Sequence, residues 1–157
     1  MIKLINFINL DPIEKEIVLK WRNHHKIKSV MHNTSDISLQ EHLNFIDSLK
    51  VKTDKKYFLV KEDNTNIGVI DFINIKNNEA ELGIYTNPLL RGYGNILLNE
   101  ICNYAFKTLK VKILKAEVYS INTAAIKLYK KFKFEELKKE KIDNKEIIFM
   151  ELRNENR

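Results

Sequence analysis

Three side chains of this sequence, Asp71, Glu81 and His42, have the chemistry to accept a proton from a substrate. Glu81 alternates with apolar neighbours in the segment 79–85, so it faces away from the core of a predicted strand. Asp71 interrupts an apolar row in a neighbouring strand, where a carboxyl group needs a partner or a cleft. His42 lies early in a predicted helix and has an imidazole suited to a base, but it also fits a half-exposed helical side chain. The identity of a base stays open among the three.

A pair of glycines follows the strand that carries Glu81. The turn Arg91-Gly92-Tyr93-Gly94 separates this strand from a helical segment. Glycines in such a turn let backbone N–H groups approach a phosphate at the positive end of the helix dipole. The same four residues also fit an ordinary strand-to-helix turn, so the surroundings must decide between the two interpretations.

Periodicity and turn chemistry predict the elements that must position these groups. Helices are expected to begin after Asp11 and Ser38, each followed by a glutamate three residues on, after the glycine pair, and after Asn122. Apolar and β-branched runs predict seven strands, at 2–7, 57–60, 67–75, 79–85, 113–119, 134–140 and 146–152. We therefore expect an α/β fold of the α+β type, with about seven strands and four helices in a single domain over 1–153 and a polar tail at 154–157.

Composition excludes several classes of function. The 157 residues are 44% hydrophobic and 31% charged, which is typical of one globular domain. The net charge of +6 would help to steer an anionic ligand, but the lysines are scattered, which argues against nucleic acid. No long apolar run predicts a membrane span or a secretion signal, so we expect a cytoplasmic protein. The lone Cys102 fits a buried structural thiol, and with four histidines it makes no ligand set, so no metal is expected.

Two segments resemble the coenzyme-binding motifs of the GNAT superfamily of N-acetyltransferases. The first motif is an Arg or Gln, two residues, Gly, one residue, then Gly or Ala, and Arg91-Gly92-Tyr93-Gly94-Asn95-Ile96 resembles it between a strand and a helix. The second segment, 122–134, is similar to the superfamily's later strand-to-helix segment. It has Asn122, Ala125, Leu128, Tyr129 and Phe134 in register, and Lys133 where glycine is usual.

This resemblance implies a mixed, strongly bent sheet that opens into a V between strands 79–85 and 113–119, with acetyl-coenzyme A as co-substrate. It implies that the backbone of Ile84, Tyr85 and Thr86 pairs with the pantetheine amides. It places the diphosphate on Arg91, Gly92, Tyr93, Gly94 and Asn95, with Asn122 and Ala125 near the coenzyme. Tyr129 matches the position of the general acid that protonates the departing thiolate.

In the superfamily the first two helices and the loop between them carry the acceptor pocket, and here that region begins at Trp21, Arg22, Asn23 and His24. A tryptophan offers a flat apolar surface, and an arginine offers a planar fork for a phosphate or carboxylate. Alternatively, Trp21 ends the core stripe of its helix and Arg22 is solvated.

Five further segments resemble, more narrowly, the N-acetyltransferases of bacterial pseudaminic acid synthesis. This implies acetylation of the 4-amino group of UDP-4-amino-4,6-dideoxy-N-acetyl-β-L-altrosamine, a small-molecule nucleotide sugar used for flagellin glycosylation, by a monomer or homodimer. Two alternatives stay open: an N-terminal acetyltransferase of the ribosomal-protein type and a non-catalytic coenzyme-binding module. The segments are Trp21-Arg22-Asn23-His24, Gln40-Glu41-His42-Leu43, Lys56-Tyr57-Phe58-Leu59-Val60, Ile67-Gly68-Val69-Ile70-Asp71-Phe72 and Asn99-Glu100-Ile101.

Overall fold

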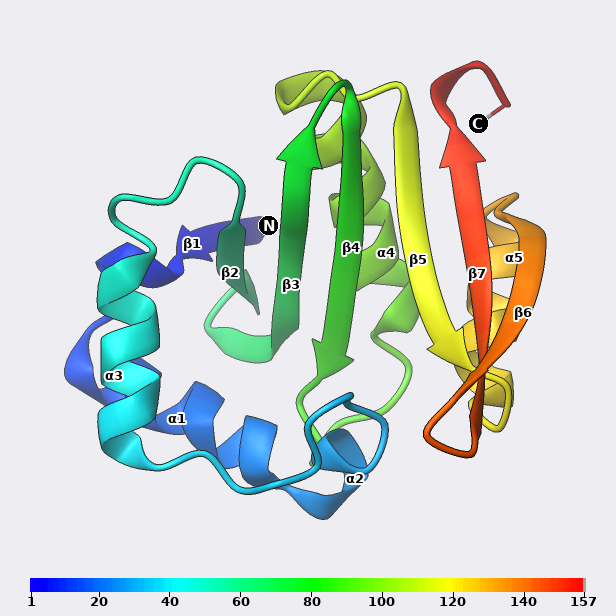
Figure 1. Ribbon diagram of the computed structural model, residues 1–157. Helices are drawn as coiled ribbons and strands as arrows, with labels where there is room; N and C mark the ends of the chain where they lie inside the picture. The colour runs from blue at the N-terminus through cyan, green and yellow to red at the C-terminus, as the bar shows by residue number, and fades with distance from the viewer. Residues whose placement is uncertain (157) are drawn as a thin grey trace.

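The computed structural model describes residues 1–156 and contains one mixed sheet of seven strands in the order β1-β2-β3-β4-β5-β7-β6 (Figure 1). The strands are β1 Ile2–Asn6, β2 Lys56–Glu62, β3 Thr65–Lys76, β4 Glu79–Thr86, β5 Ile113–Tyr119, β6 Glu135–Ile142 and β7 Lys145–Arg153. Within the described residues, five α-helices flank the sheet: α1 Pro12–Asn23, α2 His25–Lys28, α3 Leu39–Ser48, α4 Gly94–Asn103 and α5 Thr123–Lys131. The predicted GNAT-type architecture is confirmed.

The first four strands form an antiparallel sheet that places Asp71 at its centre. Asp71 on β3 is paired with Tyr57 on β2 and with Gly83 on β4. The turns between these strands use Asp63, Asn77 and Asn78 with positive φ angles of 54°, 50° and 64°. Asp and Asn tolerate this left-handed conformation better than other non-glycine residues, which explains why the hairpins turn at these points.

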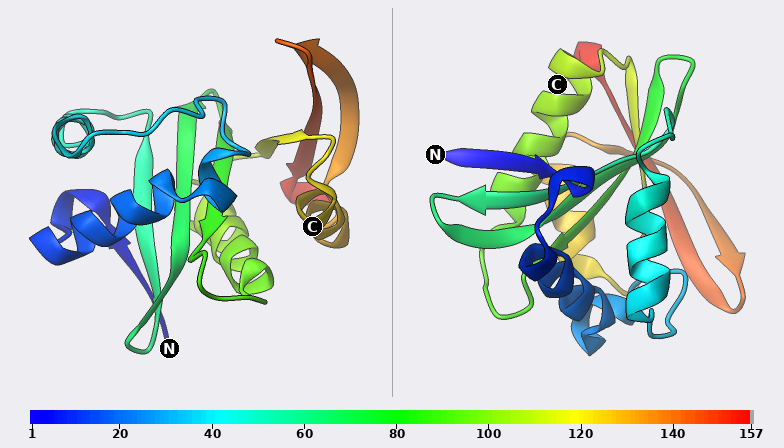
Figure 2. Two further views of the ribbon diagram at one scale, coloured as in Figure 1. Left: turned by 90° about the horizontal axis from the view of Figure 1, so that it is seen from below. Right: turned by 90° about the vertical axis from the view of Figure 1, so that its left-hand side faces the viewer.

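The helices begin where the sequence predicts. Both capping boxes form: the Asp11 carboxylate accepts from the Glu14 N–H at 2.8 Å, and the Ser38 hydroxyl accepts from the Glu41 N–H at 3.1 Å. Helix α4 lies behind β3 and β4, and α3 lies on the opposite side of the sheet, as the view from below shows (Figure 2). The apolar side chains on the two faces of the sheet pack against these helices and form two buried clusters.

The sheet divides where β4 meets β5. These two strands are parallel and pair at only three positions: Glu79 with Ile113, Ala80 with Leu114 and Glu81 with Lys115. Beyond them β5 turns toward β7, and the half made of β5, β7, β6 and α5 swings away from the first four strands (Figure 2). The expected V between strands 79–85 and 113–119 is therefore present.

The structure adds a helix to the four expected and shows what Lys133 does in place of the usual glycine. A short fifth helix, α2, follows α1 directly, because His24 ends α1 and its imidazole Nδ1 accepts from the Lys26 N–H at 3.1 Å. Lys133, which stands where the family usually has glycine, adopts a φ of 73° after α5. A 3₁₀ turn occupies Asn154–Asn156 of the predicted polar tail, and Arg157 lies outside the described residues.

Candidate active site

A cavity of about 420 Å³ lies where β4 and β5 diverge. Its walls come from the polar face of β4, the end of β5, the start of α5 and the loop between α2 and α3. Nine of the residues singled out from the sequence line it: Arg22, His42, Asp71, Glu81, Ile84, Tyr85, Asn122, Ala125 and Tyr129. The fold thus brings the three candidate bases and the candidate acid to one space.

Two carboxyl groups meet across the open end of the β4–β5 ladder. Glu81 is the last β4 residue paired with β5, and Glu117 lies two residues beyond its partner Lys115, on the same face of β5. The two side chains share a hydrogen bond. The pKa of Glu81 is raised to about 8, first by burial, then by this bond and the negative charges of Glu117 and Asp71. The positive charge of Lys115 acts in the opposite direction and lowers it. A carboxyl group so perturbed can accept and release a proton near neutral pH.

Asp71 is the most deeply buried carboxyl group of the cavity wall. Its residue is 8% exposed, and burial raises its pKa to about 7, although Lys55 acts in the opposite direction. Gly83 faces it from β4: a Cβ at that position would lie 2.6 Å from the Asp71 Cγ. The glycine therefore makes room for the carboxyl group, which explains why a strand interior tolerates a residue of low β-propensity here.

Three tyrosines surround Asp71. Burial raises the pKa of Tyr57, Tyr85 and Tyr129, and the negative charge of Asp71 raises each further. All three phenols therefore stay protonated at physiological pH. Tyr129 is 4% exposed, lies on the inner face of α5 beside Phe134 and lines the cavity, where its hydroxyl can serve as a proton donor.

His42 lines the cavity but is held by the backbone of α1. Its Nε2 lies 2.9 Å from the carbonyl oxygen of Lys15. Because a carbonyl only accepts, Nε2 carries the proton in this contact and Nδ1 is left as the acceptor. Burial is the main reason why the pKa of His42 is lowered. The neutral ring therefore joins α3 to α1 at the side of the cavity.

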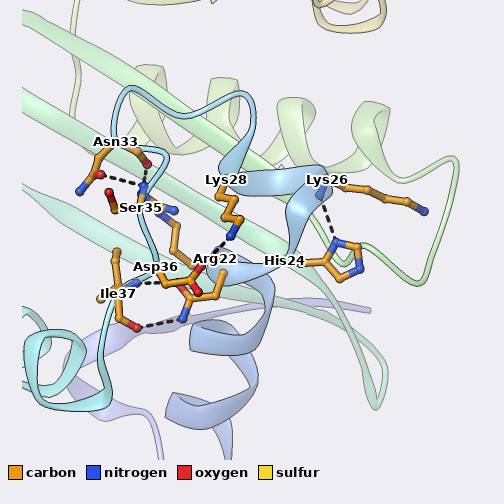
Figure 3. A network of polar contacts seen from close by, with 9 residues as sticks. Arg22, His24, Lys26, Lys28, Asn33, Ser35, Asp36 and Ile37 are labelled. Atoms are coloured by element: carbon orange, nitrogen blue, oxygen red, sulfur yellow. Dashed lines mark hydrogen bonds and ion pairs between the residues drawn. The ribbon is translucent and has the colours of Figure 1, made fainter.

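The four residues expected at the acceptor pocket divide into different roles. Arg22 lines the cavity: its Nη2 donates to the carbonyl of Asn33 at 2.7 Å, and its Nη1 is buried with no partner among the described residues. The side chain of Asn23 instead fastens the loop, donating to the Ile37 carbonyl at 2.8 Å and accepting from its N–H at 2.7 Å. Figure 3 shows this polar network.

The other two of these four residues point elsewhere. Trp21 is 6% exposed and packs in the apolar cluster with Val18 and Leu59, so the indole belongs to the core. His24 caps α2, and its ring stacks on His25 with centroids 4.4 Å apart. Neither ring contributes to the cavity wall as the described chain forms it.

The glycine turn has the geometry of an anion cradle. Gly92 has a φ of 82°, and Gly94 begins α4 so close to α5 that a Cβ would lie 3.1 Å from Leu128. Within the described residues no side chain caps α4, so its first N–H groups stay available to a ligand. Lys131 of α5 donates to the Asn95 side chain at 3.0 Å, placing a cation beside the turn.

The segment that begins at Asn122 has its expected local structure. The Asn122 side chain accepts from the Ala125 N–H at 3.3 Å and begins α5, and both residues line the cavity. Ile84 and Tyr85 line it from β4, which ends at Thr86. Beyond Glu81, β4 no longer pairs with β5. Its unpaired backbone edge runs past these residues toward the glycine turn.

Among the cavity residues that sequence reasoning missed are His32, Glu117 and Tyr119. The signal for two of them was present, because Lys115, Glu117 and Tyr119 alternate with apolar residues along β5, as Glu81 does along β4. His32 lies in a loop without periodicity, so only the fold brings it to β5.

Two kinds of feature are absent from residues 1–156. They contain no helix long and apolar enough to cross a membrane. They also contain no group of three or more His, Cys, Asp or Glu side chains arranged to hold a metal ion.

Comparison with known proteins identifies this arrangement. The family model of the acetyltransferase (GNAT) domain matches residues 8–135. The chain is 49% identical over 134 residues, 85% of each sequence, to acetyltransferase PseH of Campylobacter jejuni. The crystal structure of Campylobacter jejuni N-acetyltransferase PseH in complex with acetyl coenzyme A superposes with a TM-score of 0.83 at 40% identity, covering 98% of this chain and 99% of that one.

A more distant structure has the same fold. Spermidine N-acetyltransferase from Vibrio cholerae, in complex with CoA and spermine, gives a TM-score of 0.89 at 19% identity over 99% of this chain and 96% of its own. The chain therefore belongs to the GNAT family of acetyltransferases and is an acetyl-coenzyme A-dependent N-acetyltransferase.

Proposed function

We propose that this chain acetylates the 4-amino group of UDP-4-amino-4,6-dideoxy-N-acetyl-β-L-altrosamine in cytoplasmic pseudaminic acid biosynthesis, which supplies flagellin glycosylation. The observation that carries the proposal is the similarity to PseH, 49% identical over 85% of both sequences. The segments that resemble enzymes of this pathway are spread over most of the chain, and they include Arg22, His42 and Asp71 of the cavity wall.

The carboxyl groups at the open end of the ladder suit an amine acceptor. An ammonium must lose a proton before its nitrogen can attack the thioester carbonyl. We assign Glu81 as the base of this step, because its neighbour Glu117 helps to raise its pKa to about 8. Asp71 lies deeper and is paired in register with Gly83, so in this mechanism its charge tunes the pKa of Glu81 rather than receiving the proton. His42 is hydrogen-bonded to the Lys15 carbonyl, so in this mechanism it has a structural role in the cavity wall.

Tyr129 is the acid of the proposed mechanism. The acetyl thioester would enter between β4 and β5 with its pantetheine amides along Ile84 to Thr86 and its diphosphate on Arg91 to Asn95. The amine attacks the thioester carbonyl, the tetrahedral intermediate collapses, and the thiolate leaves. The buried, protonated phenol of Tyr129 can then protonate the leaving sulfur.

Arg22 supplies a contact for an oxygen-rich acceptor. Its Nη1 is buried beside the cavity without a partner in residues 1–156, and leaving a buried donor unsatisfied costs about 1–3 kcal/mol. A carbonyl, hydroxyl or phosphate oxygen of the acceptor would remove this cost. We assign Arg22 to the acceptor sugar or its diphosphate on this basis.

The charges also orient the acceptor. Asp71, Glu81 and Glu117 line the cavity and repel a diphosphate, while they attract an ammonium. The 4-amino group would therefore enter first, and the uridine diphosphate would remain on the side of Arg22 and the outer surface of this chain of net charge +6.

The test measures release of free coenzyme A thiol from acetyl-coenzyme A by the purified protein. One reaction contains the UDP-4-amino sugar, a second contains N-terminal peptides of ribosomal proteins, and a third contains no acceptor. Release with the sugar alone supports the proposal. Release with a peptide would replace the sugar by a protein N-terminus, and binding of acetyl-coenzyme A without release in any tube would make the chain a coenzyme-binding module.

A further inference from the structure

The residues around Glu117 form a contact between the loop after α2 and the end of β5. The His32 Nε2 lies 3.9 Å from the Glu117 Oε1. The other ring nitrogen, Nδ1, lies 3.2 Å from the Tyr119 hydroxyl, and the two rings meet edge to face with centroids 5.6 Å apart. The imidazole of His32 is thus within hydrogen-bond distance of Tyr119 on one side and within ion-pair distance of Glu117 on the other, two residues apart on β5.

These contacts connect the inside of the cavity to solvent. Glu81 is hydrogen-bonded to Glu117, and the Glu117 side chain is only 26% exposed. The His32 side chain is 68% exposed, although His32 also lines the cavity. Proton-carrying groups therefore follow one another from a half-buried carboxyl group to an exposed imidazole within interaction distance at each step.

The charges that face this chain of groups come from several elements. Glu81 faces Glu117 on β5, Asp71 on β3 and Lys115 on β5. Lys115 is engaged with Glu79, to which its Nζ lies at 2.8 Å. Glu117 faces His32, whose other side is held by Tyr119. Two adjacent carboxylates are disfavoured, so the pair retains one proton until a neighbour removes it.

We propose that Glu117 and His32 form a proton relay that carries the proton of the acceptor ammonium from Glu81 to solvent. This inference rests on the proposed transfer to an amine at Glu81. In each turnover the nitrogen loses two protons as it becomes an amide, and the sulfur of coenzyme A gains one. One proton therefore has to leave the site, and His32 accepts it from the carboxyl pair and releases it to water or buffer.

The experiment compares His32→Ala with the matched control His25→Ala. His25 is also a histidine of this region, but it stacks on His24 and lies outside the cavity wall. We expect His32→Ala to lower kcat by about 10- to 100-fold, in the range of a lost proton-transfer group. Added imidazole should restore the rate in proportion to its concentration, because it can diffuse to the exposed position that the ring leaves. His25→Ala should keep the wild-type rate and gain nothing from imidazole.

A second variant tests the carboxyl step. Glu117→Gln removes the like charge next to Glu81, so the acidic inflection of the kcat/KM profile, which Glu81 sets from its pKa of about 8, should move to lower pH. A normal rate for His32→Ala, or a loss that imidazole does not repair, would overturn the relay, as would an unmoved inflection in Glu117→Gln.

Failure of the relay and failure of the proposed function give different results. The wild-type protein alone decides whether the nucleotide sugar is the acceptor. The ratios of variant to wild-type rates, measured with whichever amine the wild-type protein acetylates, decide whether His32 and Glu117 carry the proton.

Discussion

Replacing Asp71 by Asn should make the stability of the protein less sensitive to pH. The carboxyl group has a reference pKa of 3.8 and a pKa of about 7 in the fold, with burial as the main cause. A folded-state pKa above the unfolded value means that the protonated acid stabilises the fold. This contribution is complete below pH 3.8 and is lost as the pH rises toward 7. An asparagine at this position would keep the shape of the side chain but could not ionise.

The size of the effect follows from the two pKa values. Each unit of separation corresponds to about 1.4 kcal/mol, so ionisation of Asp71 between pH 5 and pH 7 removes up to about 3 kcal/mol from the free energy of unfolding. For a chain of 157 residues this corresponds to roughly 6–12 °C in Tm. Loss of the Asp71 charge also makes Glu81 easier to ionise, which changes stability in the same direction.

The assay is thermal unfolding of the wild-type protein and Asp71→Asn at pH 5 and pH 8. Any constant cost of the amide cancels when the Tm difference between the two proteins is compared at the two pH values. The Tm of Asp71→Asn should rise relative to the Tm of the wild-type protein as the pH increases. A Tm difference that stays the same at pH 5 and pH 8 would refute the argument, because it would mean that Asp71 ionises like an exposed carboxyl group.

Three further outcomes are expected. Tyr129→Phe should reduce kcat by about 10- to 100-fold and leave the calorimetric Kd of acetyl-coenzyme A unchanged, because the ring still packs in the core. Gly83→Ala should cost about 1–3 kcal/mol in urea unfolding, since its Cβ would overlap the Asp71 carboxyl group, and most of this cost should vanish in an Asp71→Ala background. Asn23→Ala removes two hydrogen bonds to Ile37, of 2.8 and 2.7 Å, so limited proteolysis should cut the 29–36 loop faster than in the wild-type protein.

Much of the fold could be predicted because its signals are local. The helix starts at Asp11 and Ser38 and the strand at 113–119 each depend on a few neighbouring residues, and the structure has these features where expected. The short helix α2 was missed because four residues give no apolar period, and a polar side chain, His24, both ends α1 and caps α2.

Cavity residues that come from distant segments were harder to predict than the glycine turn and the segment that begins at Asn122. The residues 91–95 and 122–125 lie at helix starts and have local signatures, whereas Arg22, His32 and Glu117 meet only because three distant segments fold together. Trp21 illustrates the problem: a tryptophan at a helix end suits either a ligand or the core, and its 6% exposure places it in the core. Sequence spacing along a helix does not distinguish these two outcomes.

The acidity of the cavity follows from where the β4–β5 ladder ends. Along the paired part, Lys115 neutralises Glu79 at 2.8 Å, as opposite charges on neighbouring strands usually do. Lys115 is also the register partner of Glu81, but its ammonium is engaged with Glu79, and beyond this pair the strands separate, so Glu117 faces the gap. The two glutamates can then lower their mutual repulsion only by sharing a proton or by attracting a cation. The same break in hydrogen bonding that opens the cavity thus places a carboxyl pair beside it, with the charge to attract an ammonium group and the proton affinity that the proposed mechanism requires.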